Sequence, residues 1–124
     1  MLENQITKNN LRKMVISFYT VVLKDELVAP FFIEKLGPNL TSKTWGEHLD
    51  LLTDFWASIY LNDFNYQGNP FVPHMELEGL ETQTFHRWLK LFFETLDTIY
   101  EPYISDMIKN RSNLIAGNFM RNLG

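Results

Sequence analysis

Apolar side chains recur at steps of three and four residues along most of this 124-residue chain. That spacing places side chains on one face of an α-helix. It predicts long helices over residues 7–23, 41–61 and 82–100, and a further long helix that begins at Pro102. The sequence lacks the sustained alternation of apolar and polar residues that strands need. We therefore expect an all-α fold.

Short irregular stretches join these predicted helices. Pro30 prevents a continuous ideal helix through the apolar segment 27–33, so we expect only a single turn there. Gly37 is expected to end that segment, and Thr41 or Ser42 can cap the helix that follows. The inner face of the last helix is expected to carry Ile104, Met107, Ile108, Leu114, Ile115 and Phe119.

The joins that cover residues 24–40 and 62–81 are longer than an ordinary up-and-down helical bundle requires. Loops of this length are often functional. The sequence has no internal repeat, no low-complexity run and no sign of a second domain, so we expect one domain over residues 1–124.

Composition removes several functional classes. The absence of cysteine excludes disulfides, iron–sulfur clusters and metals held by thiolates. The net charge of −4, with lysine and arginine scattered along the chain, argues against nucleic acid as a partner. A polar N-terminus and the lack of a long apolar run predict no signal peptide and no membrane span, so we expect a cytoplasmic protein. Aromatic residues make up 15% of the chain, which suits either a large flat ligand or a large core.

The three histidines are the candidate metal ligands. His86 lies off the apolar stripe of its helix and is expected at the surface. His48 lies within the stripe of residues 41–61, where it is either a core-edge residue or a gate that faces a bound ligand. His74 follows Pro73 in an irregular segment. It is either an exposed loop residue or a metal ligand, because a loop can aim an imidazole inward.

Motifs for other metal and catalytic sites are missing. The sequence has no His-Glu-x-x-His zinc motif, no pair of Glu-x-x-His segments for a di-iron bundle, and no glycine-rich phosphate loop. A zinc or di-iron enzyme is therefore disfavoured. A helical interaction module without a cofactor, in which the histidines are incidental, is an open alternative.

Five segments of the sequence resemble the truncated haemoglobins of group III. They are Phe18-Tyr19, Ala29-Pro30-Phe31-Phe32, Trp45-Gly46-Glu47-His48 with Phe55-Trp56, Pro73-His74-Met75-Glu76-Leu77, and Phe85-His86-Arg87-Trp88. The resemblance covers nearly the whole chain, in the family's order and spacing. One departure is Gly79, where the family more often has proline, and it bears on where the next helix begins. The resemblance implies a shortened globin fold, in which two antiparallel helix pairs form a two-over-two sandwich around haem b.

The resemblance also implies roles for individual residues. His74 matches the proximal ligand of the haem iron, and Tyr19, His48 and Trp88 match the polar residues on the distal side. The expected haem-lining residues, each of which could equally be plain core, are Phe32, Leu52, Trp56, Leu77, Leu80 and Phe92. Arg87 could reach a haem propionate, but a solvated surface position suits it better.

These residue types suit a haem that binds small ligands. One axial histidine leaves the opposite iron position open, and Tyr19, His48 and Trp88 each carry a proton that can be donated. A hydrogen bond to a charged acceptor contributes about 1.5–3 kcal/mol, so such a site would release dioxygen or another diatomic ligand slowly. Peroxidase-like or nitric oxide-detoxifying chemistry fits the same donors, but turnover would need an external reductase because the sequence has no reductase domain.

Overall fold

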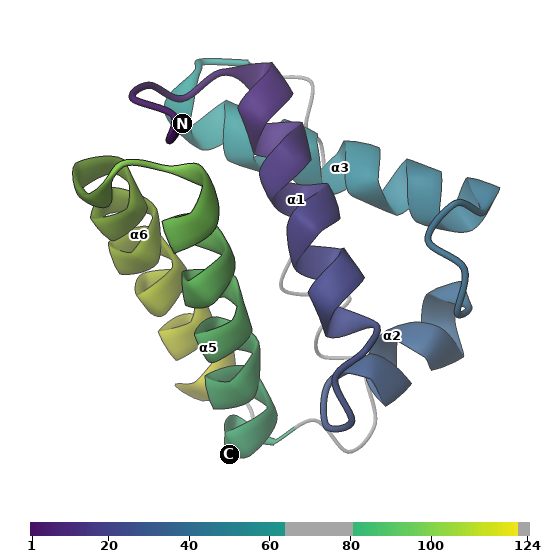
Figure 1. Ribbon diagram of the computed structural model, residues 1–124. Coiled ribbons are helices and arrows are strands. Elements are labelled where there is room, and N and C mark those ends of the chain that lie inside the picture. The colour runs from purple at the N-terminus through teal and green to yellow at the C-terminus, as the bar shows by residue number, and fades with distance from the viewer. Residues whose placement is uncertain (64–80, 122–124) are drawn as a thin grey trace.

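The computed structural model describes residues 1–63 and 81–121, and this part of the chain is all helical (Figure 1). The described helices are α1 (Lys8–Val22), α2 (Ala29–Leu36), α3 (Lys43–Tyr60), α5 (Thr82–Ile99) and α6 (Pro102–Arg121). Within these residues the only strand-like pairing is an isolated bridge between Glu3 and Tyr100. The expectation of an all-α fold is confirmed. No described helix has the length and apolar character needed to cross a bilayer.

The helices form two layers. The antiparallel helices α5 and α6 lie side by side in one layer, while α1 and α3 form the other (Figure 1). Helix α1 packs against both α3 and α5, so it lies at the centre of the molecule. The short α2 lies between the end of α1 and the start of α3 (Figure 1). This is the two-over-two arrangement of helices that the resemblance implied.

Side-chain caps fix the start of α1. The Thr7 hydroxyl accepts a hydrogen bond from the Asn10 N–H at 3.1 Å, and the Asn10 side chain accepts one from the Thr7 N–H at 3.0 Å. This reciprocal pair satisfies two N–H groups that a helix leaves free at its start. The Tyr100 hydroxyl donates to the same Asn10 oxygen at 2.8 Å. The cap therefore also ties α1 to the corner between α5 and α6.

The segment around Pro30 is an eight-residue helix, so the expectation of a single turn is wrong. Pro30 lies in the first turn of α2, where a missing N–H breaks no helical hydrogen bond. Gly37 ends α2 with φ of 86°, a backbone conformation that glycine adopts at little cost.

The inner face of α6 also differs from expectation. Met107 and Leu114 are 44% and 65% exposed, whereas the sequence placed both in the core. The buried positions of α6 are Ile104, Ser105, Ile108, Ser112 and Ala116. These positions keep the helical spacing, but small residues occupy several of them at the contact with α5. The buried face of α6 therefore includes small polar residues that the apolar pattern does not mark.

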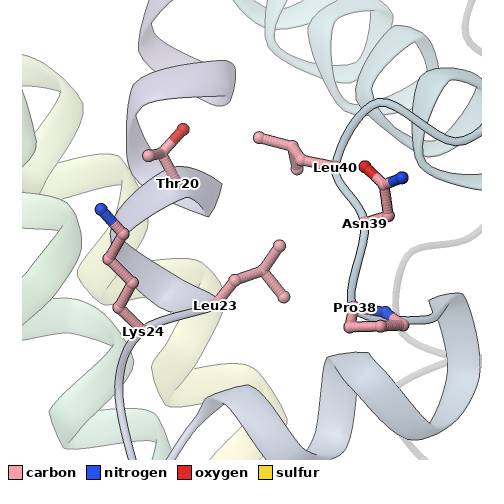
Figure 2. Close-up of a pocket in the computed structure, with 6 residues that line it drawn as sticks. All are labelled: Thr20, Leu23, Lys24, Pro38, Asn39 and Leu40. Atoms are coloured by element: carbon pink, nitrogen blue, oxygen red, sulfur yellow. The ribbon is translucent and has the colours of Figure 1, made fainter.

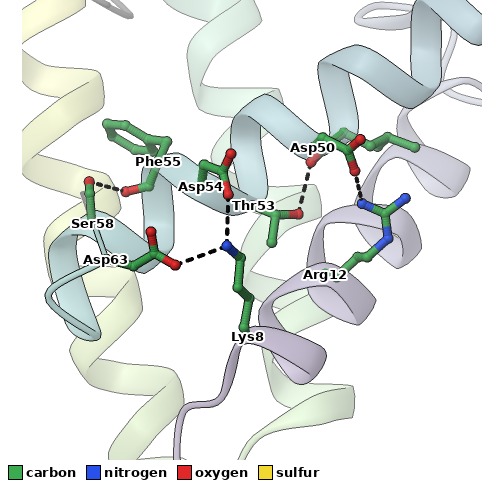
Figure 3. Close-up of polar contacts among 9 residues, drawn as sticks. Lys8, Arg12, Asp50, Thr53, Asp54, Phe55, Ser58 and Asp63 are labelled. Atoms are coloured by element: carbon green, nitrogen blue, oxygen red, sulfur yellow. Dashed lines mark hydrogen bonds and ion pairs between the residues drawn. The ribbon is translucent and has the colours of Figure 1, made fainter. Parts of the chain in front are cut away.

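Ion pairs join α1 to α3 and to the segment that follows α3 (Figure 3). The Lys8 ammonium lies 3.0 Å from an Asp54 carboxylate oxygen and 2.9 Å from one of Asp63, and Arg12 pairs with Asp50 further along α1. Residue numbers rise along α1 as they fall along α3, so the two helices run antiparallel. All these pairs are solvent-exposed on at least one side, and such pairs contribute little to stability.

Candidate functional site

Tyr19 is the centre of a group of aromatic side chains between the layers. It lies on α1 and is 5% exposed. Its ring centroid lies 5.2 Å from that of Phe32 on α2, 5.4 Å from that of Trp45 and 5.8 Å from that of His48, both on α3. The His48 ring meets the Tyr19 ring edge-on, at an interplanar angle of 80°. Three helices therefore converge on one phenol.

The Tyr19 hydroxyl also contacts α5, because the Trp88 side chain hydrogen-bonds to it. The indole N–H can only donate, so the hydroxyl oxygen accepts and its own proton is left for another acceptor. Burial raises the pKa of Tyr19 well above its usual value, and the hydrogen bond from Trp88 only partly opposes that rise. The hydroxyl is therefore protonated at neutral pH and is available as a donor.

His48 lies against two aromatic rings. Its ring centroid lies 5.5 Å from that of Trp45, at an interplanar angle of 84°, and its Nε2 atom is buried. The Trp45 indole Nε1 donates to the Gly37 carbonyl oxygen at 2.8 Å, which pins the connection between α2 and α3. The sequence pattern placed Trp45 on the inner stripe of its helix but did not identify it as a residue that lines the site. Its position one turn before His48 is the signal that could have found it.

A stack of aromatic rings continues from Trp88 into the core. Trp88 stacks on Phe92 with centroids 5.3 Å apart, and Phe92 stacks on Trp56 with centroids 5.7 Å apart. Four of the residues expected to line a haem belong to the main apolar cluster or pack directly against it: Phe32, Leu52, Trp56 and Phe92. These residues form the apolar surroundings of the three polar side chains.

The remaining predicted site residues are distributed differently. His74, Leu77 and Leu80 lie outside the residues that the structure describes. His86 is exposed, as expected. The structure thus brings Tyr19 together with the other two predicted distal residues, and the predicted iron ligand is among the residues that it does not describe.

Arg87 is partly exposed at the surface, as expected, with 38% of its side chain accessible, but it also forms an ion pair. Its guanidinium pairs with the carboxylate of Asp25, whose side chain is 7% exposed. Sequence reasoning assigned Asp25 no role. Its place between the end of α1 and the apolar segment of α2 is the signal that could have found it, because an aspartate there can accept from the first N–H groups of the next segment.

A separate surface pocket of about 410 Å³ lies between the end of α1 and the loop before α3 (Figure 2). The described residues that line it are Thr20, Leu23, Lys24, Pro38, Asn39 and Leu40. None of these is a predicted site residue, although Thr20 directly follows Tyr19. The pocket therefore neighbours the aromatic group without forming part of it.

The described helices form a small two-layer sandwich with polar side chains buried at its centre. Comparison with known proteins identifies the family to which this protein belongs. No family model matches the sequence. The chain is 31% identical, over 118 residues, to the group 3 truncated hemoglobin ctb of Campylobacter jejuni, a match that spans 95% of this chain and 91% of the relative. The crystal structure of the group III truncated hemoglobin from Campylobacter jejuni aligns with a TM-score of 0.92 at 32% identity, and the alignment covers 100% of this chain and 96% of that chain. The chain belongs to the group III truncated haemoglobins.

Membership of this family implies a haem cofactor. The described residues of the site suit a bound haem. Tyr19 and the Nε2 atom of His48 are buried, and Trp88 is partly buried, so their polar groups lie in apolar aromatic surroundings. A phenol, an imidazole and an indole that meet in such surroundings suit a small polar ligand held between the layers.

Proposed function

We propose that this protein binds haem b through His74 and binds dioxygen and other diatomic ligands on the opposite side of the haem. When bound, the haem would supply a five-coordinate iron with one open position for such a ligand. The observation that carries the proposal is the meeting of Tyr19, His48 and Trp88 from three helices. The single domain would cover residues 1–124, in a cytoplasmic protein.

Tyr19 is the principal donor to the ligand in this proposal. Trp88 donates to the Tyr19 oxygen and thereby orients the hydroxyl, whose proton then points to a third group. Because dioxygen held by a ferrous haem would carry partial negative charge, each hydrogen bond to it would contribute about 1.5–3 kcal/mol. Each such bond slows release of the ligand by roughly tenfold to a hundredfold. His48 supplies a further N–H from α3.

The apolar residues around these donors would hold the porphyrin and keep water out. The proposed lining consists of Phe32, Leu52, Trp56, Leu77, Leu80 and Phe92. Burying several hundred Å² of porphyrin surface contributes on the order of 10 kcal/mol as an upper bound. The same exclusion of water strengthens the hydrogen bonds from Tyr19, because competing donors are absent.

Slow release makes simple oxygen transport a poor fit, so we extend the proposal to reactive chemistry. Donors aimed at a bound ligand also suit polarisation of the O–O bond of a peroxide, which is peroxidase-like chemistry, and nitric oxide detoxification. Either reaction needs electrons from outside the chain. We therefore propose an external reductase as the partner.

Titration with haem tests the proposal. One equivalent of haem added to the wild type is expected to produce a strong Soret band. His74→Ala is expected to abolish or markedly shift that band, because it removes the proposed iron ligand. His86→Ala is the matched control, since His86 is exposed and the variant loses the same side-chain type. A wild type that takes up no haem would favour a helical interaction module without a cofactor.

A further inference from the structure

The carboxylate of Asp25 lies where α1, α2 and α5 meet. The Asp25 N–H donates to the Val22 carbonyl oxygen at 3.0 Å, so the residue continues directly from the end of α1. Its Oδ2 accepts hydrogen bonds from the N–H groups of Leu27 and Val28 at 3.2 and 3.0 Å. Its own carbonyl oxygen accepts from the N–H of Ala29, the first residue of α2, at 2.9 Å. Asp25 therefore fixes the end of α1 to the start of α2.

The other carboxylate oxygen, Oδ1, faces α5. The Arg87 Nε donates to it at 2.8 Å, and the Arg87 Nη2 lies 2.7 Å from it. Burial raises the pKa of Asp25, but the hydrogen bonds from Arg87 and from the Val28 N–H outweigh burial and hold that pKa below its usual value. The carboxylate is therefore charged at neutral pH. The Asp25 side chain is 7% exposed and the Arg87 side chain is 38% exposed, so the pair is buried at its acidic end and reaches solvent at its basic end.

Both ends of this ion pair lie close in sequence to polar residues of the site. Arg87 directly precedes Trp88 on α5, and Asp25 follows the turn of α1 that carries Tyr19. Stacking on Phe92 fixes the plane of the Trp88 ring, but a stack tolerates sliding within that plane. A hydrogen bond tolerates little misalignment. The Phe18 ring meets the Trp88 ring edge-on, with centroids 5.2 Å apart and an interplanar angle of 89°, and limits this sliding on one side. The position of the indole N–H relative to the Tyr19 oxygen then also depends on how α5 is held against α1.

We propose that Asp25 and Arg87 are positioning residues for the distal site, because their ion pair locks α5 to the α1–α2 corner and holds the Trp88 indole against the Tyr19 hydroxyl. The effect on a bound ligand rests on the proposed function, whereas the positioning of Trp88 does not. Without the pair, the indole N–H moves away from the Tyr19 oxygen, and the hydroxyl proton is no longer directed at the ligand.

The test follows the indole N–H resonance of Trp88 in the haem-loaded ferrous protein with carbon monoxide, which is diamagnetic. Arg87→Gln and Asp25→Asn are both expected to shift this resonance upfield, towards an indole that donates no hydrogen bond. The Trp45 indole, which donates to a backbone carbonyl, is the internal reference and is expected to stay in place. The C–O stretching frequency is expected to shift in the same variants. Arg87→Lys keeps the charge and is expected to recover part of the wild-type resonance position.

Arg12→Gln is the matched control. It removes an arginine from another interhelical ion pair, that with Asp50, whose side chains are 44% and 65% exposed. Neither the Trp88 resonance nor the C–O frequency should change in this variant. The proposal would be overturned if Arg87→Gln kept the wild-type Trp88 resonance and the wild-type C–O frequency. It would also be overturned if Arg12→Gln shifted the two as much as Arg87→Gln does.

The positioning role of the ion pair can be tested even if the protein does not bind haem. If the wild type takes up no haem, the Trp88 resonance is compared in the haem-free protein, where a shift in Asp25→Asn still supports the positioning role. An unshifted resonance there overturns it. If Arg87→Gln fails to fold, Asp25→Asn and Arg87→Lys provide the same comparison, because each retains part of the polar contact.

Discussion

Replacing Tyr19 by phenylalanine removes one oxygen atom from the centre of the site and leaves the ring packing intact. The lost hydroxyl accepts from Trp88 and, in our proposal, donates to the diatomic ligand. Loss of a hydrogen bond to a charged acceptor costs about 1.5–3 kcal/mol, and each 1.4 kcal/mol changes a rate about tenfold. We therefore expect dioxygen to leave the ferrous haem-loaded Tyr19→Phe variant roughly tenfold to a hundredfold faster than it leaves the wild type.

Stopped-flow mixing of the oxygenated protein with a dioxygen scavenger measures this rate. Tyr60→Phe is the matched control, because it also removes a buried hydroxyl, one that has no hydrogen-bond partner among the described residues. That variant should release dioxygen at the wild-type rate. Equal rates in wild type and Tyr19→Phe would refute the reasoning, because the hydroxyl would then make no contact with the ligand.

Three further predictions concern Trp45, Asp97 and Trp88. Trp45→Phe removes the indole that donates to the Gly37 carbonyl at 2.8 Å and should lower the free energy of unfolding by about 1–3 kcal/mol, as measured by urea denaturation. Hydrogen bonds from Lys109 and Ser105 hold the pKa of Asp97 below its ordinary value of 3.8, so their contribution to stability is fully present above pH 3.8 and is lost as the pH falls through the lower folded-state pKa. The difference in unfolding free energy between wild type and Asp97→Asn should accordingly vanish in acid, and a difference that persists below the folded-state pKa would contradict this. Trp88→Phe should lower any peroxidase-like oxidation of a dye substrate, and unaltered turnover would refute its role.

Local signals in the sequence predicted most of the framework. Thr7 and Ser42 cap α1 and α3, and Pro102 opens α6, each as its residue type indicates. The prediction was wrong on the inner face of α6, where small polar residues such as Ser105 and Ser112 are buried. A pattern of apolar residues does not mark buried serines.

The site could be predicted only in part, because its contacts join residues that are distant in sequence. Tyr19 and Trp88 were named from the resemblance to a family, but their hydrogen bond depends on how α5 packs against α1. Asp25 and Arg87 are separated by 62 positions, and no periodic pattern connects them. Trp45 was assigned to the core from its spacing alone, and its hydrogen bond to the loop before α3 depends on the path of α2.

The resonance Raman spectrum of the ferrous, ligand-free, haem-loaded protein tests the central claim most directly, because it contains a stretching band of the bond between iron and histidine. We expect the band in the wild type, its loss in His74→Gly, and its return when imidazole is added to that variant. A band that persists in His74→Gly without imidazole would contradict the account, since another residue would then hold the iron.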